Sequence, residues 1–269
     1  MPDTVTETPL LVTQEGGVVR VTLNRPARRN AMSRELVERF DALLAELKGN
    51  RAARVLVITG AGGHFCAGMD LDEAGGAGAT PEERLAAALE RNRRTGERFA
   101  AIAALPQVVV ARIEGSAFAG GLGLVCAADI AIAAEGARFA APEARRGLVA
   151  AQILPWLVRR MGRSAAARLV LQGAPIDAAA AARAGLVHEV ALDAAALDAL
   201  LGTILADIRA GAPGALAETK ALLAAMGEVA PPGYAEAGAR AFSRCSTGLE
   251  AAEGIAAFKA KRPASWAAG

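Results

Sequence analysis

One glycine-rich stretch, Glu114 to Ile130, constrains this chain more than any other part, with the residues EGSAFAGGLGLVCAADI. It follows an apolar strand predicted over Val108 to Val110 and becomes an apolar segment that ends at Asp129. Glycines at a strand-to-helix junction allow positive φ angles and let a ligand approach the backbone. The helix that follows leaves N–H groups unpartnered in its first turn, where the helix dipole adds positive charge. The stretch therefore predicts either a site for a negatively charged oxygen or tight packing of a helix on a sheet.

Two ligands fit such a site: a phosphate, or a carbonyl oxygen that becomes an enolate. The phosphate-loop pattern G-x-x-x-x-G-K-[ST] is absent because no lysine follows these glycines. The chain carries 30 basic and 28 acidic residues, a net charge of +2, which argues against a bulk electrostatic nucleic-acid binder.

Composition also constrains the compartment and the class of site. The three cysteines form no C-x-x-C pair and indicate reduced thiols in a cytoplasmic protein. The two histidines lie far apart in the sequence, so we expect no metal site. No apolar run reaches the length of a membrane span, and the polar N-terminus does not resemble a signal peptide.

Hydrophobic periodicity predicts strand–helix alternation that gives way to helices alone, which is typical of an α/β core with a helical C-terminal part. A basic turn over residues 24–30 precedes a helix capped by Ser33, and a second glycine-rich loop covers residues 60–68. The predicted strands cover residues 10–12, 18–23, 54–59, 108–110, 129–133, 138–140 and 186–190. Predicted helices include one opened by Pro81, one capped by Asp177, and others from Asp193 onward at about 213–227, 231–244 and 248–259.

Taken together, the motifs resemble the enoyl-CoA hydratase/isomerase (crotonase) superfamily over nearly the whole chain. The first block, Asn24-Arg25-Pro26 through Asn30-Ala31, is similar to the family's N-R-P-x-x-x-N-A turn. The second, residues 64–71 (HFCAGMDL), resembles its F-x-A-G-x-D-[IL] loop, and the third is the central stretch. The fourth runs from Phe139 to Leu148, and residues 254–262 (GIAAFKAKR) resemble the family's C-terminal helix. Each block alone is weak, but five in the right order are a strong signal.

The resemblance implies a crotonase-type ββα spiral core over residues 1–195 and a helical oligomerisation region over residues 196–269. It also implies an acyl-CoA thioester as substrate, with no separate cofactor because CoA is part of the substrate. The backbone N–H groups of Met69 and Gly120 are expected to bind the thioester oxygen and stabilise the enolate. The residues expected to bind the CoA part are Arg28, Arg29, Ala67, Gly68, Asp70 and Leu71. Phe258 and Lys261 are expected to reach the CoA of a neighbouring subunit in a homotrimer or a dimer of trimers.

The acyl pocket is expected to include Phe118, Gly123 and Pro142, and one of these departs from the family pattern. Hydratases of this family commonly use two glutamates. The second is present as Glu143, but the first is replaced by Gly123, which can neither activate water nor hold a proton. The pattern is similar to that of bacterial methylglutaconyl-CoA and isohexenylglutaconyl-CoA hydratases, whose substrates carry a second carboxylate. Arg145 and Arg146 could neutralise such a carboxylate or face solvent.

Three reactions stay open at this point. The first is hydration of a 2-enoyl-CoA with a single glutamate, which we favour; the others are a double-bond shift and other enolate chemistry such as decarboxylation. A different class is an RNA-binding relative, and the near-neutral charge and the single tyrosine argue against it. Glu114 and Asp70 are the nearest other acids should Glu143 not be catalytic.

Overall fold

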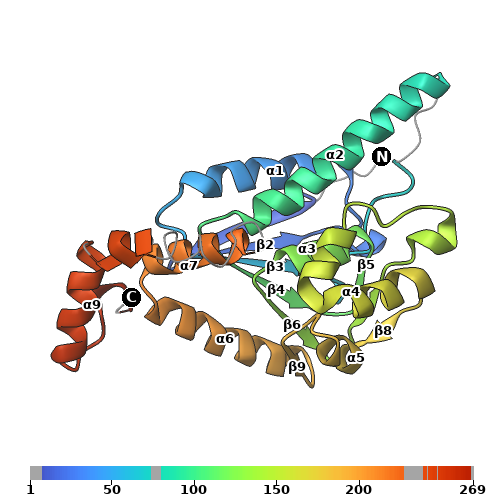
Figure 1. Ribbon diagram of the computed structural model, residues 1–269. Helices are drawn as coiled ribbons and strands as arrows, with labels where there is room; N and C mark the ends of the chain where they lie inside the picture. The colour runs from blue at the N-terminus through green and yellow to red at the C-terminus, as the bar shows by residue number, and fades with distance from the viewer. Residues whose placement is uncertain (1–7, 74–79, 227–238, 241, 247, 268–269) are drawn as a thin grey trace, which may run out of the picture.

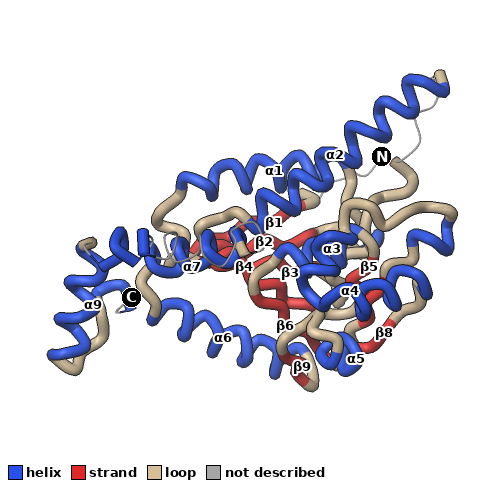
Figure 2. Tube along the Cα trace, viewed as in Figure 1, coloured by secondary structure: helices blue, strands red, loops and turns tan. Residues whose placement is uncertain are grey.

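A computed structural model describes residues 8–73, 80–226, 239–240, 242–246 and 248–267 of the chain. Its centre is a twisted sheet between two layers of helices (Figures 1 and 2). The strands lie in the order β1-β2-β3-β4-β6-β9, and only the β1–β2 pair is antiparallel. They cover β1 Leu10–Glu15, β2 Val18–Leu23, β3 Val55–Gly60, β4 Val108–Ile113, β6 Ile130–Ala134 and β9 Glu189–Ala191.

Alternating side chains of the central strands enter two separate apolar clusters, as the period of two in a strand requires. Leu56 and Ile58 of β3 point to one face, while Val55 and Val57 point to the other. The first face is covered by α1 Arg34–Gly49, the inner end of α2 Pro81–Ala103, α3 Gly120–Ala127 and α4 Leu154–Gln172. The second face is covered by α6 Ala194–Ala210, helped by α7 Pro213–Ala225.

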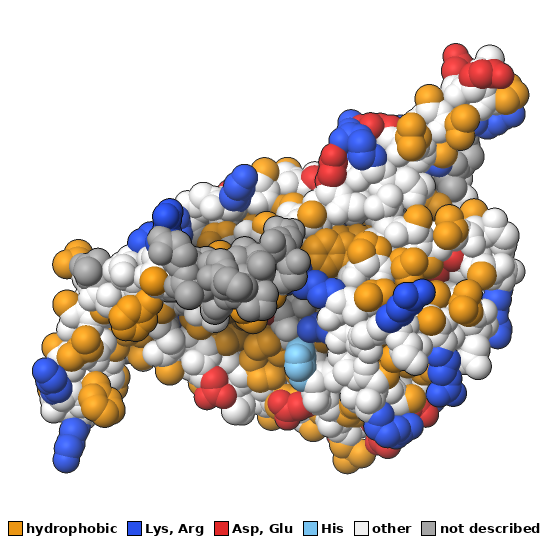
Figure 3. All heavy atoms as spheres, viewed as in Figure 1, with side chains coloured by type: hydrophobic (Ala, Val, Ile, Leu, Met, Phe, Trp, Pro, Cys, Tyr) orange, Lys and Arg blue, Asp and Glu red, His pale blue; other side chains and the backbone are white. Residues whose placement is uncertain are grey.

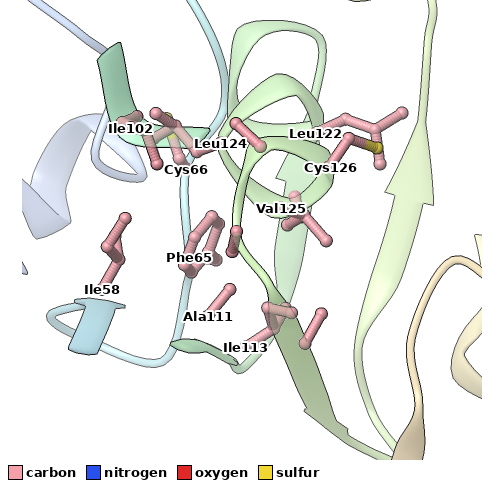
Figure 4. Packing of buried hydrophobic residues seen from close by; sticks show 14 of the residues in the cluster. Ile58, Phe65, Cys66, Ile102, Ala111, Ile113, Leu122, Leu124, Val125 and Cys126 are labelled. Carbon is pink, nitrogen blue, oxygen red and sulfur yellow. The ribbon is translucent and has the colours of Figure 1, made fainter. Parts of the chain in front are cut away.

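Phe65 occupies the centre of the first cluster (Figure 4). Its ring is fully buried and lies between α3 and the strands that carry Ile58 and Ala111. Phe65 belongs to the second glycine-rich loop, so the loop is anchored in the core by an aromatic side chain. Burial of one such ring contributes about 2–3 kcal/mol, which holds the loop against the start of α3.

Side-chain caps start the helices where the sequence predicts them. The Ser33 hydroxyl accepts the N–H of Leu36, and Thr80 forms a capping box with Glu83. The carboxylates of Asp177 and Asp193 cap α5 Ala178–Arg183 and α6 in the same way. These local signals predicted the element starts correctly.

A second, smaller sheet was only partly predicted. It consists of β5 Ser116–Phe118, β7 Arg138–Ala140 and β8 Ile176–Asp177, in that order. Strand β5 lies inside the central stretch, where the sequence predicts only a glycine-rich junction. The last strand of the large sheet begins at Glu189, later than the predicted Leu186, because only its end pairs with β6.

The remaining described elements are short 3-10 turns and the C-terminal helix. The turns are η1 Pro26–Arg28, η2 Glu143–Arg146 and η3 Ser265–Ala267, and the helix is α9 Leu249–Lys259. The helix predicted over 231–244 lies mostly outside the described residues. The predicted division at residue 195 falls at the start of α6, which packs on the sheet, and it stays a prediction.

Candidate active site

Three parallel segments bring the predicted site residues to one edge of the small sheet. Strand β5 pairs with β7 in the register Ala117 to Phe139, and Cys66 forms a parallel bridge to Ala117 on the other side. Because parallel segments leave a sheet at the same edge, the residues just beyond them meet there. Those residues are Met69, Gly120 and Glu143.

The N–H group of Met69 is turned toward α3 by pairing on the other side of its loop. The N–H of Met32 donates to the Gly68 carbonyl at 2.7 Å, and the N–H of Asp70 donates to the Met32 carbonyl at 3.1 Å. Since neighbouring peptide groups of an extended segment point in opposite directions, the Met69 N–H points away from Met32. A Cβ atom at Gly120 would lie 4.0 Å from the nitrogen of Met69, and one at Gly68 would lie 3.2 Å from the nitrogen of Gly120. The two predicted donors are therefore close together.

The N–H group of Gly120 is presented by a strained residue. Ala119 has φ 50° and ψ −121°, a conformation that favours glycine. It is held there because its N–H donates to the Ala140 carbonyl at 2.9 Å and its own carbonyl accepts the N–H of Gly123 at 3.2 Å. Such strain is found where the surrounding structure fixes a functional conformation. Here it sets the direction of the first N–H groups of α3.

Neither of these two N–H groups donates to an acceptor among the residues that the structure describes. By contrast, the neighbouring N–H groups of Phe118 and Ala119 are both used, by Cys66 and Ala140. Two free donors side by side at a helix start are suited to bind an oxygen that gains negative charge. One such donor is worth about 3 kcal/mol of barrier for a reaction that develops negative charge on oxygen.

Glu143 is the acid at this edge. It follows Pro142 after β7 and begins the turn η2. Its Oε2 atom is buried and has no hydrogen-bond partner among the described residues. Burial raises the pKa of Glu143, against the opposing effects of its own backbone N–H and the charge of Arg146. A carboxyl group with a raised pKa holds a proton more readily than an ordinary glutamate, which suits it to both taking and returning one.

The two fallback acids are both held by arginine. The Asp70 carboxylate lies 2.7 Å from the guanidinium of Arg25, and Glu114 pairs with Arg112. Burial acts to raise the pKa of Asp70, but the hydrogen bond from Arg25, the Asp72 N–H and nearby positive charge outweigh it and leave the pKa lowered. Asp70 therefore fixes the loop, and its expected contact with CoA stays a prediction.

Gly123 is buried in α3, where a Cβ atom added to it would meet the ring of Phe99. Its φ angle is not in the left-handed region, so the backbone itself would accept a side chain. The obstacle is space, because a Cβ there would lie 2.3 Å from Cζ of Phe99 and 2.9 Å from Cγ2 of Ile153. The space that the side chain of a first glutamate would need is therefore filled by Phe99 and Ile153.

The residues predicted to bind CoA lie in the basic turn over residues 24–30 and in or just after the second glycine-rich loop. Arg28 is exposed and paired with Asp72 at 2.6 Å, and Arg29 is exposed in a left-handed conformation. The side chains of Met69 and Leu71 are 44% and 55% exposed, so Met69 is not a core methionine. The other loop positions are Ala67, which is half-buried, and Gly68, which is buried at φ 95°. Their predicted roles are not tested by this arrangement.

Phe258 and Lys261 lie far from this edge within one chain. Phe258 lies in the last turn of α9 and Lys261 just after its end, and α9 occupies the opposite side of the molecule from α3 and β5 (Figure 1). Phe258 is 84% exposed. Any contact of these residues with CoA therefore requires a second copy of the chain. Arg145, meanwhile, donates to the Gln172 carbonyl at the end of α4, whereas Arg146 is exposed beside Glu143.

Asn30 is a structural residue of the site whose role was not foreseen. Its buried amide donates to the carbonyls of Ala61 and His64 at 2.8 and 2.6 Å, and its oxygen accepts the N–H of Arg25 at 2.8 Å. It thereby joins the basic turn to the second glycine-rich loop. The signal in the sequence is an asparagine that ends a turn, a residue type that tolerates its φ of 56°.

Comparison with known proteins places this arrangement in a family. The model of the enoyl-CoA hydratase/isomerase family matches residues 13–269. The structure of AtuE from Pseudomonas aeruginosa is 43% identical, with a TM-score of 0.91 over 96% of this chain and 99% of that one. An enoyl-CoA hydratase/isomerase from Marinobacter aquaeolei is 38% identical, with a TM-score of 0.90 over 96% and 99% of the chains. The 2,3-dehydroadipyl-CoA hydratase of Escherichia coli is 32% identical over 94% of this chain and 96% of its own.

The fold is thus the crotonase fold, and a buried glutamate oxygen without a hydrogen-bond partner among the described residues lies at its candidate site. The chain belongs to the enoyl-CoA hydratase/isomerase family. The predicted fold class and the predicted enzyme class, an acyl-CoA-processing hydratase, are confirmed. The comparisons favour hydration over the double-bond shift, decarboxylation and RNA binding. Within the described residues, no helix is both long and apolar enough to cross a membrane.

Proposed function

We propose that this protein adds water to 2-enoyl-CoA thioesters with Glu143 as its only catalytic carboxylate. The observation that carries the proposal is the buried Oε2 atom of Glu143, which no described residue contacts by a hydrogen bond. A buried acceptor without a partner costs stability, so its presence at the edge with two free N–H donors points to a ligand. The substrate and its water supply the missing contacts.

The chemistry follows from the two parts of the site. The thioester oxygen accepts hydrogen bonds from the N–H groups of Met69 and Gly120, which draw electrons from the double bond. The Glu143 carboxylate takes a proton from water as the water oxygen bonds to the β-carbon, and the π electrons move to the thioester oxygen. The resulting enolate collapses, and Glu143 returns its proton to the α-carbon on the same side. The net reaction is syn addition of water, which needs no cofactor.

A single glutamate could also move a proton between two carbons and shift the double bond. Hydration is preferred because similar proteins, such as the 2,3-dehydroadipyl-CoA hydratase of Escherichia coli, are named as hydratases. Product analysis separates the two reactions: hydration gives a 3-hydroxyacyl-CoA and removes the absorbance of the conjugated double bond, while a shift yields an isomer of unchanged mass.

The CoA part would lie along the exterior of the second glycine-rich loop, with its phosphates near Arg28 and Arg29. Both side chains are exposed, and the Arg28–Asp72 pair is weak enough to be exchanged for a phosphate. Arg28→Ala/Arg29→Ala should raise KM for crotonyl-CoA about tenfold with little change in kcat. An equal KM in the double variant would contradict this placement.

A homotrimer or dimer of trimers would complete the site. Helix α9 exposes large apolar side chains: Leu249 is 91%, Ile255 55% and Phe258 84% exposed. Apolar and basic side chains lie side by side at the end of the molecule that α9 forms (Figure 3). A second copy would cover this surface and bring Phe258 and Lys261 to its CoA. Light scattering should return a trimer or hexamer; a monomer at micromolar concentration would contradict this part.

Arg146 supports a narrower class of substrate, namely an enoyl-CoA whose acyl group carries a second carboxylate. Its guanidinium is exposed, and its charge already acts on Glu143. Arg146→Ala should raise KM for a dicarboxylic enoyl-CoA several-fold and leave KM for crotonyl-CoA unchanged. Arg145→Ala is the matched control, because Arg145 is engaged by the end of α4.

Calorimetric titration and a hydration assay test the proposal as a whole. Crotonyl-CoA and acetoacetyl-CoA should bind, while free crotonate should not, and crotonyl-CoA should be hydrated. Folded protein that binds neither thioester would overturn the proposed function.

A further inference from the structure

Phe99 takes the volume that a side chain at position 123 would need. A Cβ at Gly123 would lie 2.3 and 2.7 Å from Cζ and Cε2 of Phe99, and 2.9 Å from Cγ2 of Ile153. Carbon atoms in contact normally lie about 3.5–4.0 Å apart. Any side chain at this position must therefore displace the ring or the isoleucine.

The ring of Phe99 cannot move aside easily. It is fully buried, as is Ile102 on the following turn of α2. The neighbouring Arg98 is bound through two nitrogens to the carboxylate of Asp41 on α1, at 2.5 and 2.6 Å, with its side chain only 5% exposed. A bidentate pair of this kind fixes α2 against α1 and so fixes Phe99 against α3.

A second glycine strengthens this packing on the same face of α2. A Cβ at Gly96, one turn before Phe99, would lie 2.3 Å from Oε1 of Gln152. The segment that carries Gln152 and Ile153 therefore packs tightly against α2 at one glycine and against α3 at the other. The contact between Phe99, Gly123 and Ile153 belongs to a closely fitted part of the core.

We propose that Phe99 is a specificity-determining residue, because its ring prevents a second catalytic carboxylate from entering the site beside Glu143. Its ring excludes a side chain from the position where hydratases of the family commonly carry their other glutamate, and it places an apolar wall there. The inference rests on the proposed function, in which Glu143 alone handles the proton. It goes beyond that function because it assigns the exclusion to a residue on a different helix.

The test compares Gly123→Glu, Phe99→Leu and the double variant Phe99→Leu/Gly123→Glu. Leucine removes the ring atoms that a Cβ at position 123 would meet but leaves an apolar side chain to fill most of the space. Gly123→Glu alone should lower Tm strongly and should not hydrate crotonyl-CoA faster than the wild type. The double variant should have a higher Tm than Gly123→Glu alone, although Phe99→Leu by itself lowers Tm.

Activity gives the second readout. The double variant should hydrate crotonyl-CoA at least tenfold faster than Phe99→Leu, and its pH profile should gain a second ionisation from the new carboxylate. Phe40→Leu/Gly123→Glu is the control, because Phe40 is an equally buried phenylalanine of the same cluster on α1. It should recover neither Tm nor turnover.

Two results would overturn the inference. One is a Gly123→Glu variant with the wild-type Tm and a raised turnover, because Phe99 would then exclude nothing. The other is recovery of Tm in the double variant without any gain in turnover, which would make Phe99 a packing residue only. If no variant and no wild-type protein hydrates an enoyl-CoA, the proposed function fails, and with it the specificity role, whereas the recovery of Tm still reports whether Phe99 fills the space.

Discussion

Glu143 and Asp70 are two buried or half-buried carboxylates of the same site, and they have opposite electrostatic surroundings. Asp70 is bound by Arg25 at 2.7 Å, and the pKa of Asp70 is lowered despite its burial. Glu143 has a buried oxygen without a partner among the described residues, and its pKa is raised. The difference supports the proposal that Asp70 serves the structure and Glu143 the chemistry, because a proton can be moved only by a group that is free to gain and lose it.

The largest expected effect is on turnover. Glu143→Gln should reduce kcat for crotonyl-CoA hydration by about 10²–10⁴, the usual contribution of a general acid–base group, while binding of the thioester stays within a few-fold. Glu114→Gln is the control, since Glu114 is paired with Arg112. Full turnover in Glu143→Gln would remove the distinction between the two carboxylates.

Asp70→Asn should instead destabilise the protein by about 3 kcal/mol, because it leaves the guanidinium of Arg25 without its charged partner. The side chains of Arg25 and Asp70 are 21% and 7% exposed. The matched control is Asp72→Asn, whose pair with Arg28 is mostly exposed and should contribute less than about 1 kcal/mol. Chemical denaturation measures both; equal losses would mean that burial of the pair does not matter.

The stability lost in Asp70→Asn should itself depend on pH. The pKa of Asp70 is lower in the folded protein than in the unfolded chain, so its contribution is present above the unfolded value. This contribution is lost as pH falls through the folded pKa. Plots of unfolding free energy against pH for the wild type and the variant should therefore converge in that acidic range. Curves that stay parallel down to that range would contradict a charged role for Asp70.

The pH dependence of hydration should follow Glu143. Hydration needs the carboxylate form, so kcat/KM should fall as pH falls through the raised pKa of Glu143, above the ordinary glutamate value of about 4.3. Asp70→Asn, assayed at a temperature where it is folded, should show the same midpoint. A midpoint at or below the ordinary value would contradict the raised pKa.

The smallest expected effect is a gain in stability when Glu143 loses its charge. A carboxyl group whose folded pKa is raised lowers stability as pH rises from the unfolded to the folded value. Glu143→Gln should therefore be more stable than wild type near pH 7, by at most about 1 kcal/mol because solvent reaches part of the group. The gain should vanish below the ordinary glutamate pKa, which thermal melts at several pH values can follow.

The sequence predicted those features that depend on neighbours in the chain. Ser33, Asp177 and Asp193 start helices through bonds to residues three positions away, and all three starts are as predicted. The buried strand over residues 54–59 could be predicted from its continuous apolar run alone, because a strand covered on both faces has apolar residues at nearly every position.

Features that depend on distant contacts were not predictable in this way. Strand β5 has three residues and exists because β7 and Cys66 pair with it. The positive φ of Ala119 is imposed by the Ala140 carbonyl, and nothing in its residue type indicates it. For the same reason, Gly123 could be seen as a missing glutamate, but the ring of Phe99 that fills its place could not.

A structure with a bound acyl-CoA tests the central claim most directly. The account predicts that the thioester oxygen lies 2.7–3.1 Å from the backbone nitrogens of both Met69 and Gly120. It also predicts that the carboxyl group of Glu143 faces the α- and β-carbons, while Asp70 stays paired with Arg25. A thioester oxygen away from these two nitrogens, or another carboxylate closer to the reacting carbons than Glu143, would contradict it.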